Sequence, residues 1–452
     1  MYIELFGTPD AIIRNYVNLV KRQVQKSSEK FQEILEVTEM SSERAILHSD
    51  LNSFYASVEM MLDPSLKGKA VAVCGSTENR HGIVLAKSDL AKKAGVKTGM
   101  VNWEARQLCR NLIMVPPQYD QYLKYSKLTR SIYERYTDQV EPFGMDECWL
   151  DVTGSKTRGS AMEIAEQIRK SVREELGLTV SIGVSFNKIF AKLGSDMKKP
   201  DAITEITQGG FKEKVWPLHC SEMIYCGPAT TKKLAGYGIH TIGDVANADP
   251  LFLKQLLGVN GLALWSYASG NDQSRVMHRD FVSPVKSVGH GITCTADLDD
   301  DDEVFRVMLE LSQDVGHRLR IHELSARGVQ VYVRGNDLYG YQYQCKLPVR
   351  TQLPNEIAAA GFRVFKERYQ WGKKVRAVCV RAIDLVPKKD PEQLTIFDDT
   401  VRREKRERME DAVESIRARF GKRAITYAAL LGDLKMPCDG RDSVKMPGLM
   451  YQ

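Results

Sequence analysis

Two stretches of sequence decide the fold, and the first reads Ile46-Leu47-His48-Ser49-Asp50-Leu51-Asn52-Ser53-Phe54-Tyr55. The second, almost a hundred positions later, reads Phe143-Gly144-Met145-Asp146-Glu147-Cys148-Trp149-Leu150-Asp151. Each reads as a short apolar or alternating strand with a carboxylate at or near its end. We therefore expect Asp50, Asp146 and Glu147 to meet in space.

Three carboxylates on neighbouring strand ends are suited to divalent cations. Mg²⁺ takes hard oxygen ligands, usually one or two carboxylates together with substrate phosphates. Two-metal phosphoryl transfer requires a pair of ions roughly 4 Å apart. Clustered acids repel one another strongly without a cation. The spacing alone also allows a simpler interpretation, in which each acid is an ordinary strand-end or turn residue.

The sequence motifs around the acids resemble those of a known family. His-Ser-Asp-Leu-Asn-Ser-Phe-Tyr-Ala-Ser-Val-Glu (48–59), followed by Met-Asp-Glu-Cys-Trp-Leu-Asp-Val-Thr (145–153), resembles the Y-family translesion DNA polymerases, in particular the bacterial polymerase IV branch. The resemblance covers roughly residues 44 to 397. It implies low-fidelity, template-directed addition of dNTPs to a primer 3′-hydroxyl, without proofreading. It also implies two Mg²⁺ ions, replaceable by Mn²⁺, held by Asp50, Asp146, Glu147 and the backbone carbonyl of Leu51.

The same resemblance predicts an α+β multidomain fold of the right-hand polymerase type. Its parts are a palm, small fingers, a helical thumb with a helix-hairpin-helix, and a little finger of β-α-β-β-α-β order. The expected ranges are 1–40 for an extension of unknown role, 41–50 and 116–205 for the palm, 51–115 for the fingers, 206–275 for the thumb, 276–283 for a linker, 284–387 for the little finger, and 388–452 for a clamp-binding peptide, a helix and a loose tail.

Nucleotide contacts are expected from the palm and the fingers. By resemblance Tyr55 is the steric gate that excludes a ribose 2′-hydroxyl, Phe54 lies beside it, and Lys199 is the triphosphate lysine. In the fingers the sequence departs from the common pattern, because Asp89 and Lys92 stand where many relatives have a tyrosine and an arginine. Lys92 can still contact phosphate as a point charge, whereas Asp89 would repel it. Either nearby lysines rebuild the contact, or the alignment of this segment is shifted.

Three regions are expected to contact primer-template DNA. Lys188 and Lys192 share one face of a predicted helix. Residues 227–246 look like a helix-hairpin-helix, in which Gly236 and Gly238 would let backbone N–H groups approach a phosphate. A plain helical hairpin and a solvated charged face are the alternatives. The candidate phosphate contacts of the little finger are Arg327, Arg334, Lys346, Arg376 and Arg381.

A short peptide near the end of the resemblance is expected to bind a partner. Gln393-Leu394-Thr395-Ile396-Phe397 resembles the pentapeptide by which bacterial polymerases dock on the sliding clamp. Leu394, Ile396 and Phe397 would enter an apolar pocket of the clamp. Five-letter motifs also arise by chance, but the position after the little finger is the one that the resemblance predicts.

Composition sets the remaining bounds. A chain of 452 residues predicts several domains, and no stretch approaches the ~20 apolar residues of a membrane helix. Nine cysteines without a CxxC pair, and no recognisable signal peptide, indicate reduced thiols in the cytoplasm. His219, Cys220 and Cys226 fit no zinc spacing. The net charge of +6 mildly favours a polyanionic partner. We expect a monomer.

Two other functions are compatible with parts of this pattern. Nucleotide cyclases also use a palm with paired carboxylates, but the helix-hairpin-helix and the clamp peptide argue against that class. A catalytically weak or silent DNA-binding accessory, recruited to the sliding clamp, is the second alternative, suggested by Asp89. The intact acid trio argues against it, because a silent protein has no reason to keep three mutually repelling carboxylates.

Overall fold

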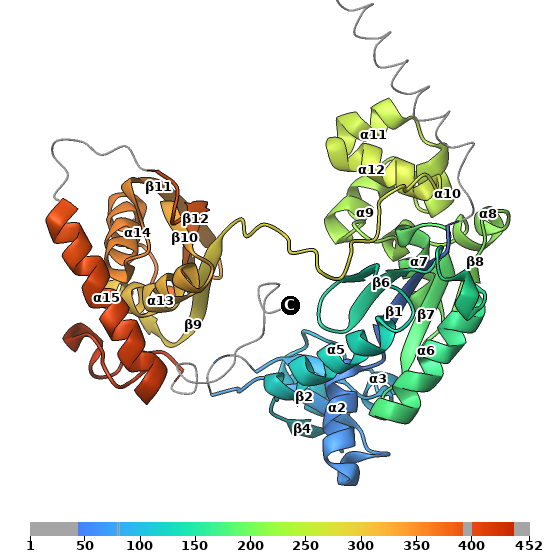
Figure 1. Ribbon diagram of the computed structural model, residues 1–452, viewed down its shortest axis with the longest axis horizontal. Helices are drawn as coiled ribbons and strands as arrows, with labels where there is room; N and C mark the ends of the chain where they lie inside the picture. Colours follow the sequence, from blue (N-terminus) through green and yellow to red (C-terminus); the bar gives the residue numbers. More distant parts are fainter. Residues whose placement is uncertain (1–43, 79, 81, 392–399, 438–452) are drawn as a thin grey trace, which may run out of the picture.

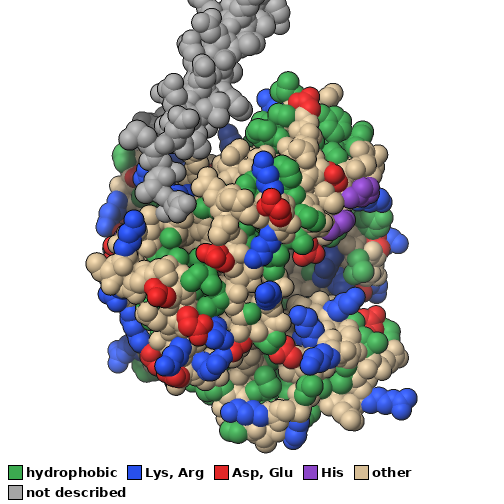
Figure 2. Space-filling view, turned by 90° about the vertical axis from the view of Figure 1, so that its right-hand side faces the viewer, with side chains coloured by type: hydrophobic (Ala, Val, Ile, Leu, Met, Phe, Trp, Pro, Cys, Tyr) green, Lys and Arg blue, Asp and Glu red, His purple; other side chains and the backbone are tan. Residues whose placement is uncertain are grey.

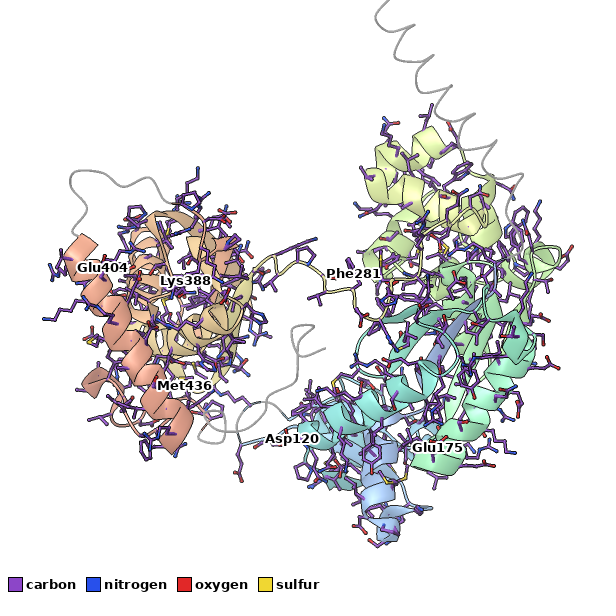
Figure 3. All side chains as sticks on the ribbon, viewed as in Figure 1. Asp120, Glu175, Phe281, Lys388, Glu404 and Met436 are labelled. Carbon is purple, nitrogen blue, oxygen red and sulfur yellow. The ribbon has the colours of Figure 1, made fainter. Side chains whose placement is uncertain are left out.

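The computed structural model describes residues 44–78, 80, 82–391 and 400–437. The expected extension 1–40 and the clamp peptide 393–397 therefore lie outside the described residues. The chain forms two lobes joined by an extended segment (Figure 1). Phe281 lies on that segment (Figure 3). The larger lobe contains a five-stranded sheet, a three-stranded sheet and the thumb helices. The smaller lobe contains a four-stranded sheet.

A five-stranded sheet with the order β5-β6-β1-β7-β8 forms the centre of the larger lobe. Strand β1 lies in the middle, antiparallel to both neighbours, and Asp50 is paired with Glu147 on β6. This pairing brings the two quoted stretches together as expected. The strands are β1 (Ile46–Leu51), β5 (Val140–Pro142), β6 (Glu147–Asp151), β7 (Val180–Ser185) and β8 (Ile203–Ile206).

Helices cover both faces of this sheet. Leu47 and Leu51 of β1 pack in one core with α5 (Tyr119–Tyr133) and α6 (Ala161–Leu176). Ile46 lies on the other face, in a cluster with Trp149 and with Ala191 of α7 (Lys188–Met197). Alternate residues of β1 therefore belong to opposite layers, and His48 and Asp50 share the α7 face with Ile46.

The ends of these helices follow from local sequence. Ser160 and Glu163 form a reciprocal capping box at the start of α6, and Gly177 ends that helix at φ 66°. The Ser-x-x-Glu spacing at 160–163 and the glycine at 177 signal these two helix ends in the sequence. Asn187 caps α7, because its side-chain oxygen accepts a hydrogen bond of 2.8 Å from Phe190 N–H.

Glycine lets α7 lie unusually close to the sheet. A Cβ atom on Gly183 of β7 would lie 1.9 Å from the carbonyl oxygen of Ala191 and 2.5 Å from the backbone nitrogen of Ser195. No side chain fits in that space. The close approach brings the inward-facing side chains of α7 into contact with residues of β1.

The fingers and the thumb flank the central sheet. The fingers hold a small sheet of order β3-β2-β4, with β2 (Val71–Cys74), β3 (Val84–Lys87) and β4 (Ile113–Val115), preceded by α2 (Phe54–Leu62). Two short helices, α3 (Asp89–Lys93) and α4 (Asn102–Leu108), complete them. The thumb consists of α8 (Phe211–Val215), α9 (Pro228–Ala235), α10 (Ile242–Asn247), α11 (Pro250–Leu257) and α12 (Val259–Ala268).

The smaller lobe has the predicted β-α-β-β-α-β order, which is confirmed. Its sheet runs β11-β10-β12-β9, and its two helices share one core with the sheet. Arg80 of the fingers reaches this lobe, with Nη1 2.5 Å from Asp297 Oδ1. The elements are β9 (Val288–Leu298), α13 (Asp301–Ile321), β10 (Leu324–Gly335), β11 (Gly340–Thr351), α14 (Pro354–Arg368) and β12 (Val375–Pro387).

The C-terminal segment folds back onto the little finger. Helix α15 (Thr400–Phe420) lies along this lobe (Figure 1), and Glu404 is on it (Figure 3). Leu430 and Leu434 are buried against Leu309 of α13. Lys435 Nζ lies 2.6 Å from Glu303 Oε1. The expectation of a loose tail is therefore wrong for the described residues 433–437, because apolar burial and ion pairs hold them in place.

The surface matches the modest net charge. Lys and Arg side chains are interspersed with Asp and Glu over the palm and thumb side (Figure 2). Across the part of the chain that the structure describes, no helix is both long enough and apolar enough to cross a membrane.

Candidate active site

Strand pairing places the three acids at one end of the central sheet. Asp50 lies opposite Glu147 in the β1–β6 register, and Leu51 N–H donates a 3.0 Å hydrogen bond to the carbonyl oxygen of Asp146. The side chain of Asp50 is only 8% exposed. The structure therefore brings together the backbones of all four residues expected at the metal site.

Two lysines lie among the acids. Lys199 Nζ is 2.6 Å from Asp50 Oδ2, and Lys192 Nζ is 2.9 Å from Glu147 Oε1. Both ammonium groups also pair with Asp196, at 2.8 and 3.1 Å. Within the described ranges no three His, Cys, Asp or Glu side chains gather closely enough to form a metal centre. The expected meeting of the three acids is thus seen in their backbones, while the side-chain oxygens of Asp50 and Glu147 are paired with Lys199 and Lys192.

Burial and neighbouring charges set the protonation of the site. Burial, and then the negative charge of Glu147, raise the pKa of Asp146 to about 6. Burial acts to raise the pKa of Glu147 as well, but His48 and Lys192 outweigh it and lower that pKa to about 2. Burial acts to lower the pKa of Lys199, but the charge of Asp50 prevails and raises it. Glu147 and Lys199 are therefore charged at neutral pH.

This donor set fits hard divalent cations. The buried groups at the sheet end are carboxylate oxygens, the ligand type that Mg²⁺ and Mn²⁺ prefer. Burial first, and then the charge of Glu147, raise the pKa of Asp146, and a bound cation would favour its ionised form. Asp50, Asp146 and Glu147, with the Leu51 carbonyl beside them, could hold such ions.

Several residues of the site were not singled out by sequence reasoning. Asp196 bridges the two lysines, and Asn52 fixes the Lys199 loop, since its Oδ1 accepts a 2.8 Å hydrogen bond from Asp201 N–H. His48 lies behind Glu147 and is fully buried. One signal could have revealed His48, because a buried polar residue within an apolar strand requires a partner.

Tyr55 is held by a cluster of aromatic rings next to the acids. Its ring stacks on Tyr122 at 4.1 Å between centroids and 9° between planes, and it meets the edge of Tyr119. Its hydroxyl lies 3.4 Å from the sulfur of Met145, the residue before Asp146. Tyr122 in turn donates a hydrogen bond to Glu59, which Gln118 also contacts. A ring fixed on several sides is suited to steric selection.

Phe54 occupies a different environment from Tyr55. Its side chain is 3% exposed and packs in the palm core. The expectation that Phe54 contacts the nucleotide is therefore wrong in this structure, because the first turn of α2 directs this side chain into the core. Phe54 supports the gate from behind, with its ring centroid 5.5 Å from that of Tyr55.

Comparison with known proteins identifies the family. Residues 49–196 match the model of the impB/mucB/samB family, and residues 285–396 match the model of its C-terminal domain. DNA polymerase IV of Acetivibrio thermocellus is 47% identical over 391 residues, which cover 86% of this chain and 98% of that protein. DNA polymerase IV 1 of Bacillus subtilis is 37% identical over 393 residues, covering 86% and 93%.

The chain belongs to the DNA polymerase IV branch of the Y-family. A solved Y-family DNA polymerase chimera shares the fold with a TM-score of 0.68, 23% identity, and coverage of 76% of this chain and 99% of that one. The palm, fingers, thumb and little finger expected from the sequence are therefore confirmed as the fold. The chain is a DNA-directed DNA polymerase of the translesion class, which acts on primer-template DNA and dNTPs.

In the fingers of this polymerase, Asp89 was expected to repel the triphosphate, and lysines lie near it in the sequence. Asp89 is exposed in the first turn of α3, next to the N-cap residue Ser88, where negative charge is favourable. Lys92 is exposed one turn later. Burial, and then the nearby charge of Lys92, lower the pKa of Lys87. The positive charge of Lys92 thus acts on Lys87, and the position of Asp89 in the first turn of a helix gives that residue a structural role.

Lys188 and Lys192 lie inside the palm and not on a DNA-facing surface. Lys188 Nζ is 2.7 Å from Glu141 Oε2 and 4.4 Å from the ring centroid of Trp149. Lys192 reaches Glu147. The expected DNA contacts at these lysines are therefore not supported. They share one face of α7, as predicted, but that face turns toward the acids of the sheet.

Replacing Lys188 with methionine should lower the free energy of unfolding by about 2 kcal/mol, because Glu141, with 22% side-chain exposure, would keep its charge and only the hydrogen bond from Met277 N–H. The salt dependence of DNA affinity should not change, since no phosphate contact is lost. Chemical denaturation and DNA binding at several salt concentrations measure both. Lys198→Met, at an exposed position on the same segment, is the control and should change stability by under about 0.5 kcal/mol. A weaker salt dependence of DNA affinity in Lys188→Met would instead show that Lys188 does contact a DNA phosphate.

The glycines of the helix-hairpin-helix close a helix. Gly236 N–H donates to Lys232 and Gly238 N–H donates to Ala235, at 3.3 and 3.1 Å. Gly238 has φ +75°, which explains the need for glycine there. The expectation that these two N–H groups bind phosphate is wrong, because both are already used. Helix α9 carries no side-chain cap at Gly227, so its first N–H groups are the ones that lack such a partner.

The candidate arginines of the little finger differ in their surroundings. Arg327 is exposed at an irregularity of β10, whereas Arg376 is half-buried on β12. Arg334 donates a 3.1 Å hydrogen bond to Thr293 of β9, so it bridges strands on the sheet. Arg381 is exposed on the same sheet. Of the five candidates, Arg327, Lys346 and Arg381 are exposed and therefore available to a phosphate.

Proposed function

We propose that Asp50, Asp146 and Glu147 hold two Mg²⁺ ions, with the backbone carbonyl of Leu51 as a further ligand and Mn²⁺ as a substitute. One observation carries this proposal, which is the register pairing of Asp50 with Glu147 beside the backbone of Asp146. When bound, the ions supply the positive charge that the attack of the primer 3′-hydroxyl on the dNTP α-phosphate requires. The three carboxylates would hold such ions at the end of the central sheet.

Primer extension tests this proposal. The purified chain, freed of metal by EDTA, should extend a primed template only when Mg²⁺ or Mn²⁺ is added with dNTPs. The products should follow the template sequence. Extension in excess EDTA would contradict the metal proposal, whereas DNA binding without extension in Mg²⁺ would favour the silent accessory.

We propose that three side chains receive the nucleotide. Tyr55 closes the space beside the sugar, because its ring is fixed against Tyr122. Lys199 neutralises triphosphate charge from the loop after α7, and it is held beside Asp50. Lys92 adds charge from the fingers, where it is exposed on α3. The role of Lys199 requires its ammonium group to move from Asp50 to a phosphate of the nucleotide.

We propose that DNA backbone is contacted by the little finger and the thumb. Arg327 is exposed on the sheet of the little finger, and Arg334 and Arg376 lie half-buried on the same sheet. The uncapped start of α9 is the thumb candidate. Such contacts position the duplex without reading its sequence.

We propose that Gln393, Leu394, Ile396 and Phe397 bind the sliding clamp. These residues follow β12 by only a few positions in the sequence. Exchanging Leu394 and Phe397 together for alanine should abolish the stimulation of extension by added clamp and leave clamp-free extension unchanged. Primer extension with and without bacterial clamp measures this. Val401→Ala, at an exposed position of α15, is the control. Leu430 would be a poor choice, because it is buried against α13 and its exchange would affect folding. Full stimulation of the double variant would refute the proposal.

We further propose the assembly and location of the chain. The domain limits remain those expected from the sequence, with the palm at 41–50 and 116–205 and the little finger at 284–387. We propose that the polymerase works as a monomer in the cytoplasm. Support comes from the eight free cysteines among the described residues, six of which are buried, as reduced thiols would be.

A further inference from the structure

The imidazole of His48 lies next to the acids, and the proposed function gives it no role. His48 is fully buried on β1, two residues before Asp50 and on the same face of the sheet. Its ring meets Trp149 edge-on, at 5.2 Å between centroids. A buried histidine is most often a core residue whose polar atoms are satisfied. The partners of its two nitrogens therefore decide whether it has a function.

Those partners are a serine and the Glu147 carboxylate. Nδ1 lies 2.8 Å from Ser195 Oγ, and Nε2 lies 3.5 Å from Glu147 Oε2. Nε2 and Oε2 are both buried, and neither has a hydrogen-bond partner within the described residues. Burying two polar atoms without partners is costly unless they serve each other. The two atoms face each other across 3.5 Å.

Counting protons fixes which nitrogen of the ring is a donor. A neutral imidazole carries one proton, on one of its two nitrogens. Ser195 Oγ can donate its single proton to the carbonyl of Lys192, 2.7 Å away, or to Nδ1. In the first arrangement a bare Nε2 faces a carboxylate oxygen, and two lone pairs repel. In the second, Nε2 carries the proton and directs it at Glu147.

We propose that His48 is a positioning residue for Glu147. Ser195 Oγ donates to Nδ1, and Nε2–H donates to Oε2, so that one carboxylate oxygen is fixed and the other, Oε1, is presented on the side of Lys192 and Asp50. The proposal rests on the proposed metal site, in which Glu147 is a ligand. Hydrogen bonds to the outer atoms of ligands commonly set their orientation and their affinity for the ion.

Packing around the ring supports this role independently. His48 is paired with Gly183 on β7, and a Cβ atom on Gly183 would collide with the backbone of α7 at Ala191 and Ser195. Gly194 of α7 approaches Gly183 in the same way, with a Cβ only 3.1 Å from its Cα. Because no side chain separates strand from helix, Ser195 reaches His48. The close approach of α7 thus assembles the serine, the histidine and the carboxylate.

The tautomer of His48 is the first test. Nitrogen NMR of protein labelled with ¹⁵N-histidine distinguishes a protonated from a bare ring nitrogen, and the signal of His48 among eight histidines is the one lost in His48→Gln. We expect a protonated Nε2 and a bare Nδ1 in the protein without DNA or nucleotide. A protonated Nδ1 with a bare Nε2 would overturn the proposal.

The affinity for Mn²⁺, measured by electron paramagnetic resonance on protein without DNA, is the second test. His48→Leu should weaken binding about tenfold or more, and His48→Gln, whose amide can still donate toward Glu147, should recover most of that loss. Ser49→Ala is the matched control. It removes a buried hydroxyl bonded to Tyr133 on the opposite face of the same strand and should leave Mn²⁺ affinity unchanged. Thermal unfolding checks that each variant is folded.

The Glu147→Gln variant separates this inference from the metal proposal. If Glu147→Gln binds Mn²⁺ like the wild type, Glu147 is not a metal ligand. The proposed metal site and the positioning role of His48 are then both refuted. If Glu147→Gln loses affinity while folded His48→Leu keeps it, the metal site stands and the positioning role is refuted. Equal losses in His48→Leu and His48→Gln would likewise refute it, because a donor at this position would then make no difference.

Discussion

The Asp146→Asn variant is expected to lose primer extension by about a thousandfold or more, at least the loss that follows removal of one group that stabilises a transition state. Asparagine keeps the size of the side chain but removes its charge, so the proposed ions lose one carboxylate. Burial first, and then the charge of Glu147, raise the pKa of Asp146 to about 6. Single-turnover extension in Mg²⁺ measures the effect.

Asp151→Asn is the matched control for that experiment. Asp151 lies at the other end of β6, paired with Ile46, and its Oδ1 accepts a hydrogen bond from Thr153 N–H. Extension should stay near the wild-type rate, because this end of the strand is remote from the site. DNA affinity should be retained in both variants. An Asp146→Asn variant that extends primers normally would remove Asp146 from the site.

Exchange of Tyr55 for alanine is expected to raise ribonucleotide incorporation, relative to dNTP incorporation, by about a hundredfold. The ring is held by Tyr122 and Tyr119, so it cannot swing away from a 2′-hydroxyl at low cost. Removing the ring opens that space and leaves the acids in place. The measurement is the ratio of kcat/KM for a dNTP and the matching rNTP on one template.

The Tyr55→Phe variant is the control, since it keeps the ring and loses only the hydroxyl contact with the sulfur of Met145. Its sugar discrimination should stay within a few-fold of the wild type. Unchanged discrimination in Tyr55→Ala would show that another group performs the selection. A loss in Tyr55→Phe equal to that of Tyr55→Ala would assign the selection to the hydroxyl.

Local patterns in the sequence predicted the elements that depend on local chemistry. The alternating strands that carry Asp50 and Glu147, the capping box of Ser160 and the order of the little finger all follow from periodicity and capping. The motifs shared with the family further predicted that Asp50, Asp146 and Glu147 belong to one site. These features were predictable because each depends on neighbours in sequence or on a specific motif.

Tertiary contacts were not predictable in the same way. The i,i+4 spacing of Lys188 and Lys192 shows that they share a face, but not whether that face meets DNA or the acids of the palm. The glycines at 236 and 238 signal a turn, but not which N–H groups the helix end already uses. His48 acquires its partners only because α7 lies close to the sheet at Gly183.

Counting bound Mn²⁺ ions tests the central proposal most directly. Electron paramagnetic resonance should find two ions per chain in the complex with primer-template DNA and a dNTP analogue that cannot react. Asp146→Asn in the same complex should hold at most one, whereas Asp151→Asn should hold two. Two ions bound with wild-type affinity in Asp146→Asn would contradict the assignment of Asp50, Asp146 and Glu147 as the metal site.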